Sequence, residues 1–185
     1  MRHGHSLANQ QGVIISSPAR GLTDYGLSRQ GRQQLESLLA TWQWAAPDRI
    51  LHSDFRRTRE TAERIAHHFG LGLEAEPRLR ERHFGELEGE KDDRYADVWR
   101  HDAQDAHHRH AGVEALATVA ARMGEVVADL ERDYAGKTIL LVSHGDPLQI
   151  LLTALEGREL CRHRERVSLT PASITPLSPA EWDGD

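Results

Sequence analysis

Apolar residues in the first half of the chain recur at spacings that predict a strand, a helix and a second strand. The run Arg49–Ser53 is short, rich in apolar residues and preceded by the turn signal Ala-Pro-Asp, which is typical of a buried strand. Residues 54–70 then carry an apolar stripe at spacings of three and four, formed by Phe55, Thr58, Ala62, Ile65 and Phe69. This stripe predicts an amphipathic helix that stops at Gly70, and residues 71–77 are the candidate second strand.

The second half of the chain repeats this pattern. Residues 112–134 predict a long amphipathic helix, because apolar side chains alternate steps of three and four at Val113, Leu116, Ala120, Met123, Val127, Leu130 and Tyr134. Within residues 137–144, four consecutive apolar residues from Ile139 to Val142 indicate a strand buried on both faces of a parallel sheet. Residues 145–157 predict a further helix, with Asp146 as its N-cap, Pro147 at its first position and Gly157 as its stop.

Two further segments complete the predicted architecture. Residues 27–42 predict a helix with Ser28 as its N-cap, and residues 172–185 hold one short edge strand before a polar end. No long-period repeat and no long linker divides the chain. The pattern favours the α/β class: one domain over residues 1–185, built as a three-layer α/β/α sandwich with a mostly parallel central sheet.

Composition narrows the classes of function. The 185 residues are 38% hydrophobic and 28% charged, which is ordinary for a soluble globular protein. A net charge of -6 without a block of basic residues argues against a nucleic-acid partner. No apolar run reaches the length of a membrane span, and the N-terminus lacks a signal-peptide pattern. The single cysteine, Cys161, excludes an internal disulfide and fits a cytoplasmic location.

Polar residues that suit an anion follow two of the predicted strands. Ser53, Arg57 and Thr61 stand at i, i+4 and i+8, and therefore on one helical face. His144 and Gly145 stand where the strand predicted within residues 137–144 meets a helix N-terminus. The free N–H groups of that N-terminus favour negative charge. An arginine on a helix is more often solvated, so the prediction of a phosphoryl pocket rests on several such features meeting at strand ends.

A loop at residues 79–89 adds carboxylates to this region. Glu81, Glu86 and Glu88 crowd this glycine-bearing loop. Carboxylates near a phosphate pocket would repel the substrate unless one of them is protonated. Protonation is the property that a general acid requires.

Five ordered blocks cover nearly the whole chain and resemble the histidine phosphatase superfamily, also called the phosphoglycerate mutase-like family. They are RHGHSLAN at 2–9, LSRQGRQQ at 27–34, SDFRRTRETA at 53–62, LRERHFGELEG at 79–89 and VSHG at 142–145. Residues 112–115, Gly-Val-Glu-Ala, are similar to the family's Gly-Glu-Ser element, with Ala115 in place of serine. Arg-His-Gly alone is a weak signal, whereas five blocks in the expected order are a strong one.

The resemblance implies a phosphohistidine mechanism. His3 would be the nucleophile that attacks phosphorus and forms a covalent intermediate. Arg2, Arg57 and His144 would clamp the phosphoryl oxygens and stabilise their charge in the transition state. Glu81 would give a proton to the leaving oxygen and then activate water. The resemblance implies no metal and no cofactor, because the arginines and histidines supply the positive charge.

Four further positions are expected to contact the substrate. Asn9 matches a family position that donates a hydrogen bond to the phosphate, and Gly4 would let the backbone pass close to it. Gly145 stands with His144 at the helix N-terminus. Residues 10–27 fit the family pattern in two registers; in either they are expected to form a loop over the pocket mouth, from which Arg20 could reach a substrate. His5 departs from the pattern, because the family commonly has Glu or Gln there.

Three functions are compatible with this resemblance. Hydrolysis of a small phosphomonoester is favoured because residues 90–112 are short and carry five Asp without paired arginines. The expected partner of the pocket is such a phosphorylated substrate or inorganic phosphate. The alternatives are phosphoryl transfer of the cofactor-dependent phosphoglycerate mutase type and a non-catalytic phospho-ligand-binding module. A metal site is a weaker hypothesis, since no standard ligand spacing fits the histidines at 101, 107, 108 and 110. The sequence selects neither one phosphomonoester nor an oligomeric state.

The position of the Arg-His-Gly triplet creates a structural problem. Related chains reach this triplet through an apolar strand in the middle of the sheet, whereas here it begins at Arg2. Loss of a central strand would leave its neighbours with unpaired backbone groups. The sequence therefore predicts that the first central strand is truncated and that the natural chain extends upstream of Met1. The rival hypothesis is a short sheet with a loosely held His3.

Overall fold

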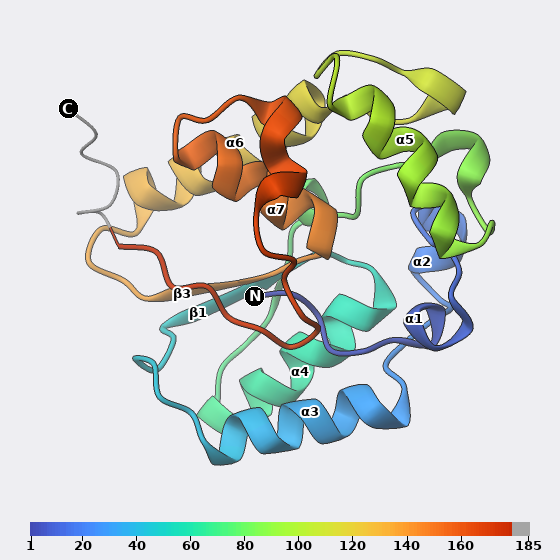
Figure 1. The fold of residues 1–185 in the computed structure, drawn as a ribbon. Helices are drawn as coiled ribbons and strands as arrows, with labels where there is room; N and C mark the ends of the chain where they lie inside the picture. Colours follow the sequence, from blue (N-terminus) through green and yellow to red (C-terminus); the bar gives the residue numbers. More distant parts are fainter. Residues whose placement is uncertain (179–185) are drawn as a thin grey trace.

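The computed structural model describes residues 1–178 and places a small parallel sheet at the centre of the molecule (Figure 1). The strands are β1 (Arg49–His52), β2 (Glu74–Ala75) and β3 (Ile139–Val142). Their order is β2-β1-β3, with both pairings parallel. The predicted strands at 49–53 and 139–142 are confirmed, and that in 71–77 shortens to two residues because a 3-10 turn begins at Pro77.

Helices cover both faces of this sheet, so the predicted α/β/α layering is confirmed (Figure 1). On one face lie α3 (Arg29–Ala40) and α4 (Arg56–Phe69), and on the other lie α6 (Leu116–Asp133) and α7 (Gly145–Leu155). The predicted caps of the first face are present. Ser28 accepts a hydrogen bond from the amide of Gly31 at 3.1 Å, and Gly70 ends α4 in the left-handed conformation.

Alternation along the strands builds two hydrophobic cores. Ile50 and Val142 point into a core shared with α3 and α4, whereas Leu51 points into a core shared with α6 and α7. Successive side chains of a strand project to opposite faces, so an apolar run on a covered sheet fills both layers. Full burial of one such side chain contributes about 1.5–3 kcal/mol. These two cores fix the strand ends at which the polar residues lie.

The first three residues extend the sheet beyond β3. Arg2 forms a parallel bridge with Ser143, and the amide of His3 donates to the Ser143 carbonyl at 3.0 Å. On the other edge, the Arg2 amide donates to the Ser173 carbonyl, and the Ala172 amide donates to the His3 carbonyl, both at 3.0 Å. The described first strand is therefore reduced to a single bridge, yet the backbone of His3 is paired on both sides. This pairing argues against a loosely held His3.

A smaller third hydrophobic core packs the segments near the strand ends that carry the polar residues. Short helices α1 (Leu7–Gln11), α2 (Pro18–Gly21) and α5 (Tyr95–Asp102) lie on this side of the molecule (Figure 1). The 3-10 turns are Pro77–Leu79, Gly85–Leu87, Asp92–Arg94, His110–Gly112 and Leu160–Glu165. The third core consists of Ile14, Phe84, Leu87, Val98 and Val113. It joins the 79–89 loop to α5 and to the segment after Gly12.

Two predicted details are wrong, and a third is contradicted in its described part. The helix predicted from residue 112 begins at Leu116, because Val113 is buried in the third core and its backbone is extended. The helix predicted to start after Asp146 begins at Gly145 with His144 as its N-cap, since the Asp146 carboxylate forms an ion pair with Arg82 instead of capping. In the predicted tail strand, residues 172–178 form no strand, and residues 179–185 lie outside the described part.

Candidate active site

The carboxyl ends of β1 and β3 bring the predicted chemical residues together. Ser53 follows β1 and Arg57 lies in the first turn of α4, while His144 follows β3 as the N-cap of α7. His3 joins them because residues 1–3 pair with the end of β3. In parallel sheets these ends form a common edge where ligands bind. All four side chains are buried.

The hydrogen bonds of His3 define its tautomer. Nδ1 lies 2.7 Å from the carbonyl oxygen of Gly4, and a carbonyl can only accept, so Nδ1 carries the proton. The lone pair therefore sits on Nε2, which accepts from Arg57 Nε at 3.2 Å. Burial, followed by the charges of Arg57 and Arg2, lowers the pKa of His3 well below its usual value. A neutral imidazole with an unprotonated Nε2 is a nucleophile at neutral pH.

His144 is held beside His3 in a complementary way. Its Nε2 lies 2.9 Å from Ser53 Oγ, and its Nδ1 accepts from Arg57 Nε at 3.2 Å. The His3 and His144 rings meet edge to face, with centroids 5.2 Å apart. Burial and the Arg57 charge lower the pKa of His144 well below its usual value. One guanidinium N–H thus lies between two neutral imidazoles.

Two arginines bring unsatisfied donors to this cluster. Arg57 Nη2 donates to the Ile15 carbonyl at 2.9 Å, so the segment after α1 contacts this cluster. Arg57 Nη1 and Arg2 Nε are buried and have no hydrogen-bond partner among the described residues. Leaving buried donors unpaired is costly, about 1–3 kcal/mol each. An anion with several acceptor oxygens would satisfy both of them.

Glu81 completes the cluster from the 79–89 loop. Its Oε1 accepts from the Arg82 amide at 3.0 Å, and its Oε2 lies 3.7 Å from both Arg57 Nη2 and His144 Nδ1. Burial raises the pKa of Glu81 to about 7, and the Arg57 charge opposes this increase. The carboxyl group can therefore gain or lose a proton near neutral pH, as a proton donor must.

At the two predicted glycines, Gly4 and Gly145, close packing leaves little room for a side chain. A Cβ on Gly4 would lie 3.1 Å from Leu27 Cδ2 and 3.2 Å from the Gly31 carbonyl oxygen, so contact with α3 already requires a small residue. The Gly4 amide donates to Thr61 Oγ1 at 3.1 Å, and that contact positions the triplet. A Cβ on Gly145 would lie 3.3 Å from Arg2 Cζ, so this glycine lets the Arg2 guanidinium pack against the start of α7.

Asn9 and Arg20 do not join the cluster. Asn9 Oδ1 accepts from the Ser6 amide at 3.0 Å and forms the capping box of α1. Arg20 Nη2 donates to the Tyr25 hydroxyl at 2.6 Å, and its guanidinium also approaches Gly89. Among residues 1–178, neither side chain has a hydrogen bond to the residues around His3. Their predicted substrate contacts remain predictions.

Sequence reasoning missed the arginines that hold the Glu81 loop. Arg82 is fully buried and forms a two-pronged ion pair with Asp102, with both contacts at 2.7 Å. Arg122 of α6 donates to the carbonyl of Arg80 at 2.9 Å. The Glu81-Arg82 pair lies in a quoted block, but the partners 20 and 41 positions away give no local signal.

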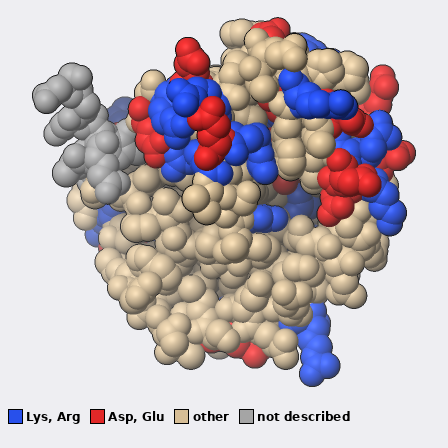
Figure 2. Space-filling view, viewed as in Figure 1, with Lys and Arg blue, Asp and Glu red and all other residues tan. Residues whose placement is uncertain are grey.

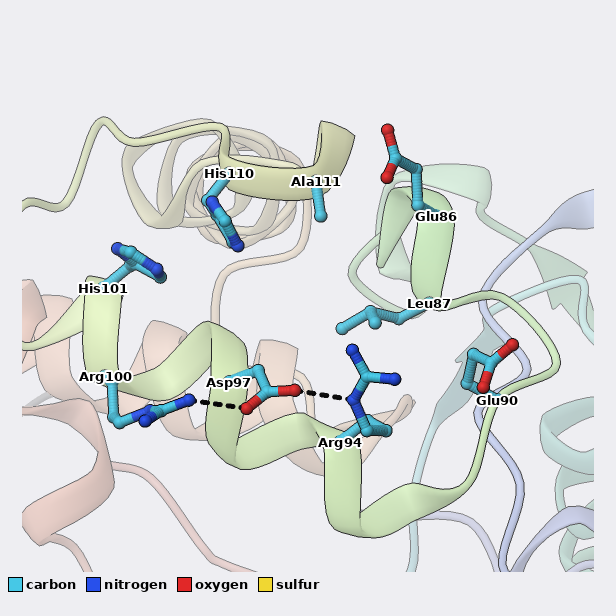
Figure 3. A pocket seen from close by; sticks show the side chains of 9 residues that line it. All are labelled: Glu86, Leu87, Glu90, Arg94, Asp97, Arg100, His101, His110 and Ala111. Carbon is cyan, nitrogen blue, oxygen red and sulfur yellow. Dashed lines mark hydrogen bonds and ion pairs between the residues drawn. The ribbon is translucent and has the colours of Figure 1, made fainter.

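Charged side chains also gather on the outer surface around α5. Figure 2 shows them over the upper part of this face, above a hollow in which Lys or Arg atoms are visible. A separate cavity of about 470 Å³ lies at α5 (Figure 3). It is lined by Glu86, Leu87, Glu90, Arg94, Asp97, Arg100, His101, His110 and Ala111. None of the residues grouped around His3 lines it. No helix within residues 1–178 is both long and apolar enough to cross a membrane.

Solved structures share this fold. A structure described as mycobacterial hydrolase 1 covers 93% of this chain and 86% of its own, with a TM-score of 0.78 and 28% identity. A mycobacterial glucosyl-3-phosphoglycerate phosphatase in complex with inorganic phosphate covers 93% of this chain and 84% of its own, with a TM-score of 0.74 and 27% identity.

Sequence relatives lead to the same family. A glucosyl-3-phosphoglycerate phosphatase of Mycobacterium tuberculosis is 32% identical over 96% of this chain and 83% of its own length. A probable phosphoglycerate mutase GpmB of Photorhabdus laumondii is 33% identical over 90% of this chain and 76% of its own. The sequence model of the histidine phosphatase superfamily (branch 1) matches residues 1–184. The chain belongs to the histidine phosphatase superfamily.

Proposed function

We propose that this protein is a phosphomonoesterase that hydrolyses a small phosphorylated metabolite through a phosphohistidine on His3. One observation carries the proposal: His3 Nε2, which bears the unprotonated lone pair, lies in a buried cluster and shares one Arg57 N–H with His144. Two unpartnered arginine nitrogens at this pocket suit the oxygens of a phosphoryl group. Nucleophile and anion-binding groups therefore meet at one point.

In the first half-reaction, the lone pair of His3 Nε2 attacks phosphorus and the bond to the leaving oxygen breaks. Arg2 and Arg57 donate to the phosphoryl oxygens, where charge is spread in the transition state. The substrate's negative charge opposes the effect of Arg57 on the pKa of His144 and favours uptake of a proton from solvent at Nδ1. The Arg57 N–H then turns from Nδ1 to the phosphoryl group, and His144 donates its new N–H to a phosphoryl oxygen.

Glu81 donates a proton in the first half-reaction and accepts one in the second. Its protonated carboxyl gives the proton to the leaving oxygen, so the product departs as an alcohol. In the second half-reaction the carboxylate takes a proton from water while the water oxygen attacks the phosphohistidine. The N–P bond breaks, inorganic phosphate forms, and Glu81 regains its proton. The cycle is balanced without a cofactor.

The pH dependence of turnover follows from these two groups. Because the pKa of His3 lies well below its usual value, His3 stays unprotonated on the mildly acidic side of neutrality. Because the pKa of Glu81 is raised to about 7, the phosphorylation step is expected to slow as pH rises through about 7. We call this fall of kcat at high pH the alkaline limb of the pH profile. It is measured by steady-state rates with an alkyl phosphate, whose leaving oxygen needs the proton.

Glu81→Gln tests the assignment of that limb. With an alkyl phosphate, kcat is expected to fall by about 10²–10⁴-fold and to lose its alkaline limb. With p-nitrophenyl phosphate the leaving group needs no proton, so phosphorylation survives, water activation fails and a burst of p-nitrophenol precedes slow turnover. An unchanged alkaline limb in Glu81→Gln would contradict the role of Glu81.

Hydrolysis is favoured over phosphoryl transfer by the lid, residues 90–112. Its Arg94 and Arg100 both bind Asp97 at 2.6 Å, and all three line the outer cavity in Figure 3. A mutase must keep water from its phosphorylated intermediate and bind two positions of the substrate. Arginines tied to an aspartate at the outer cavity do not line the cluster around His3, and this supports water as the acceptor.

A panel of phosphorylated metabolites tests hydrolysis against transfer. We expect the release of inorganic phosphate from p-nitrophenyl phosphate and from at least one sugar-linked phosphoglycerate or sugar phosphate. The similarity to a glucosyl-3-phosphoglycerate phosphatase makes that substrate the first to try. Exchange between 2- and 3-phosphoglycerate that depends on 2,3-bisphosphoglycerate and outpaces phosphate release would contradict the proposal. Phosphate binding without any turnover would indicate a non-catalytic module.

The proposed setting of this activity is simple. We place the enzyme in the cytoplasm as one domain over residues 1–185, with a phosphorylated small molecule as its partner. The unbonded Cys161 supports a reducing compartment.

A further inference from the structure

The backbone that leads into Glu81 is held from outside the pocket by Arg122. Its Nη1 donates to the carbonyls of Arg78 at 2.6 Å and Arg80 at 2.9 Å, and its Nη2 reaches the Glu81 carbonyl at 3.4 Å. Both carboxylate oxygens of Glu114 hold the same guanidinium, at 2.8 and 3.0 Å. Three carbonyl groups within residues 78–81 are thereby fixed to α6.

Arg82 holds the other side of Glu81. Its guanidinium forms the two-pronged pair with Asp102, the last residue of α5, and donates through Nε to the Glu114 carbonyl at 2.7 Å. Its Nη1 also lies 3.3 Å from Asp146 at the start of α7. A planar fork bonded on three sides cannot rotate, so the main chain of Arg82 is fixed as well.

Stability alone does not account for such a network. The Arg82 and Asp102 side chains are 0% and 1% exposed, and the cost of removing two charges from water can exceed their attraction. Apolar residues of similar volume would fill the same space at least as well. The network does, however, end at the one N–H that binds Glu81 Oε1, the amide of Arg82. Its rigidity is transmitted directly to that carboxyl group.

The consequence is the position of the second oxygen, Glu81 Oε2. It stays 3.7 Å from Arg57 and from His144, whereas a charge-assisted hydrogen bond is about 2.7–2.9 Å long. A carboxylate free to move would close this gap and pair with Arg57. Such a pair would favour the charged form of Glu81, which then could not carry a proton to a leaving group.

We propose that Arg82, Asp102 and Arg122 are positioning residues that hold the Glu81 carboxyl group out of direct contact with Arg57 and His144. The proposal rests on the proposed role of Glu81 as proton donor and extends it to three residues remote from the substrate. Asp102 also belongs to α5 and accepts from His108 at 2.6 Å. The lid helix is therefore part of the device that sets the proton donor.

Several charged or titratable groups face Glu81, and each can affect its pKa. They are Arg57 of α4, Asp146 of α7, His144 before it, Arg2 and Tyr95 of α5. Loss of the clamp brings Glu81 nearest to Arg57, so the pKa of Glu81 falls. The alkaline limb of kcat must then move to lower pH.

Asp102→Asn tests the clamp, because it keeps the shape of Asp102 and removes the charge that fixes Arg82. We expect a fall in kcat of about 10–100-fold, with KM little changed and the alkaline limb lower by about one pH unit. The matched control is Asp97→Asn, on the same helix and also paired with arginines but only partly buried. It should retain the wild-type rate and pH profile.

Arg122→Lys separates position from charge, since the net charge is unchanged and only the fork that binds the carbonyls is lost. Arg122→Lys should also move the alkaline limb of kcat to lower pH. Arg132 is exposed on the same helix, so Arg132→Lys should leave the limb unchanged. A carbon-13 NMR titration of the Glu81 carboxyl, assigned with Glu81→Gln, reads the same shift without turnover. This measurement also covers a variant that is folded but inactive.

The outcomes separate this inference from the proposed function. If both Asp102→Asn and Arg122→Lys keep the wild-type limb and the wild-type carboxyl titration, the clamp is wrong although the enzyme is a phosphatase. A reduced melting temperature with an unchanged limb also overturns it, because that result is purely structural. If the wild-type protein hydrolyses no phosphomonoester while the carboxyl titration still shifts, the proposed function fails and the clamp stands.

Discussion

Replacement of His3 by alanine is expected to abolish turnover, with a loss in kcat of about 10⁵–10⁶-fold, as for the removal of a nucleophile elsewhere. Uncatalysed hydrolysis of phosphate monoesters is among the slowest reactions known, with enzymatic accelerations that reach about 10²¹-fold. The remaining cations of the pocket can still bind phosphate, but they cannot form the covalent intermediate. Steady-state release of inorganic phosphate measures this loss.

The control for His3→Ala is a histidine that the pocket does not use. His67 is exposed in the last turn of α4, so His67→Ala should keep the wild-type rate. Binding of inorganic phosphate to His3→Ala, measured by calorimetry, should persist because Arg57 and His144 remain. A His3→Ala variant that retains more than about one part in a hundred of the wild-type kcat would contradict nucleophilic catalysis by His3.

Arg57→Met is expected to lower kcat/KM by about 10³–10⁵-fold, the range found for an arginine that stabilises a transferring phosphoryl group. Arg57 orients His3 and His144 through one N–H, and its Nη1 is free for the substrate. Methionine fills the volume but provides no donor. Because the substitution leaves the buried Ile15 carbonyl unpaired and removes the cation beside Glu81, the melting temperature should fall. Rates are therefore compared well below the melting temperature of the variant, which separates lost catalysis from lost folding.

Arg59→Met is the matched control for Arg57→Met. Arg59 lies on the same helix, half exposed, and its only ion pair within residues 1–178 is the 3.6 Å contact with Glu63. An exposed pair of this kind contributes about 0–1 kcal/mol, and activity should not change. Equal losses in both variants would mean that α4 matters as a helix and that Arg57 has no special role. Arg57→Lys should also fail, because an ammonium lacks the Nε that lies between the two imidazoles.

The sequence predicted the layers of the fold because apolar spacing is a local signal. The stripe on α4 and the run Ile139–Val142 each follow from a single segment, and the structure confirms both. Element ends were less predictable, since they depend on partners far along the chain. Asp146 reads as an N-cap from its own neighbours, but Arg82, 64 positions away, takes its carboxylate.

The residues of the candidate site also differ in how well local sequence patterns predict their positions. Arg57 and His144 follow predicted strands, so topology alone brings them together at one edge. His3 reaches this edge through main-chain pairing with Ser143, and periodicity cannot reveal such pairing in a segment of three residues. The positions of Asn9 and Arg20 depend on local capping and on loop packing, and neither can be read from a motif. The raised pKa of Glu81 depends on its burial, which only the folded chain provides.

Identification of the phosphorylated side chain is the most direct test of a phosphohistidine enzyme. Wild-type protein would be mixed with p-nitrophenyl phosphate, quenched in alkali to protect phosphohistidine, digested and analysed by mass spectrometry. Glu81→Gln, in which water activation is impaired, should accumulate more of the intermediate. The mechanism predicts one added phosphoryl group on the peptide that carries His3, and none in His3→Ala. Rapid turnover with the phosphoryl group on another side chain, or on none in Glu81→Gln, would contradict it.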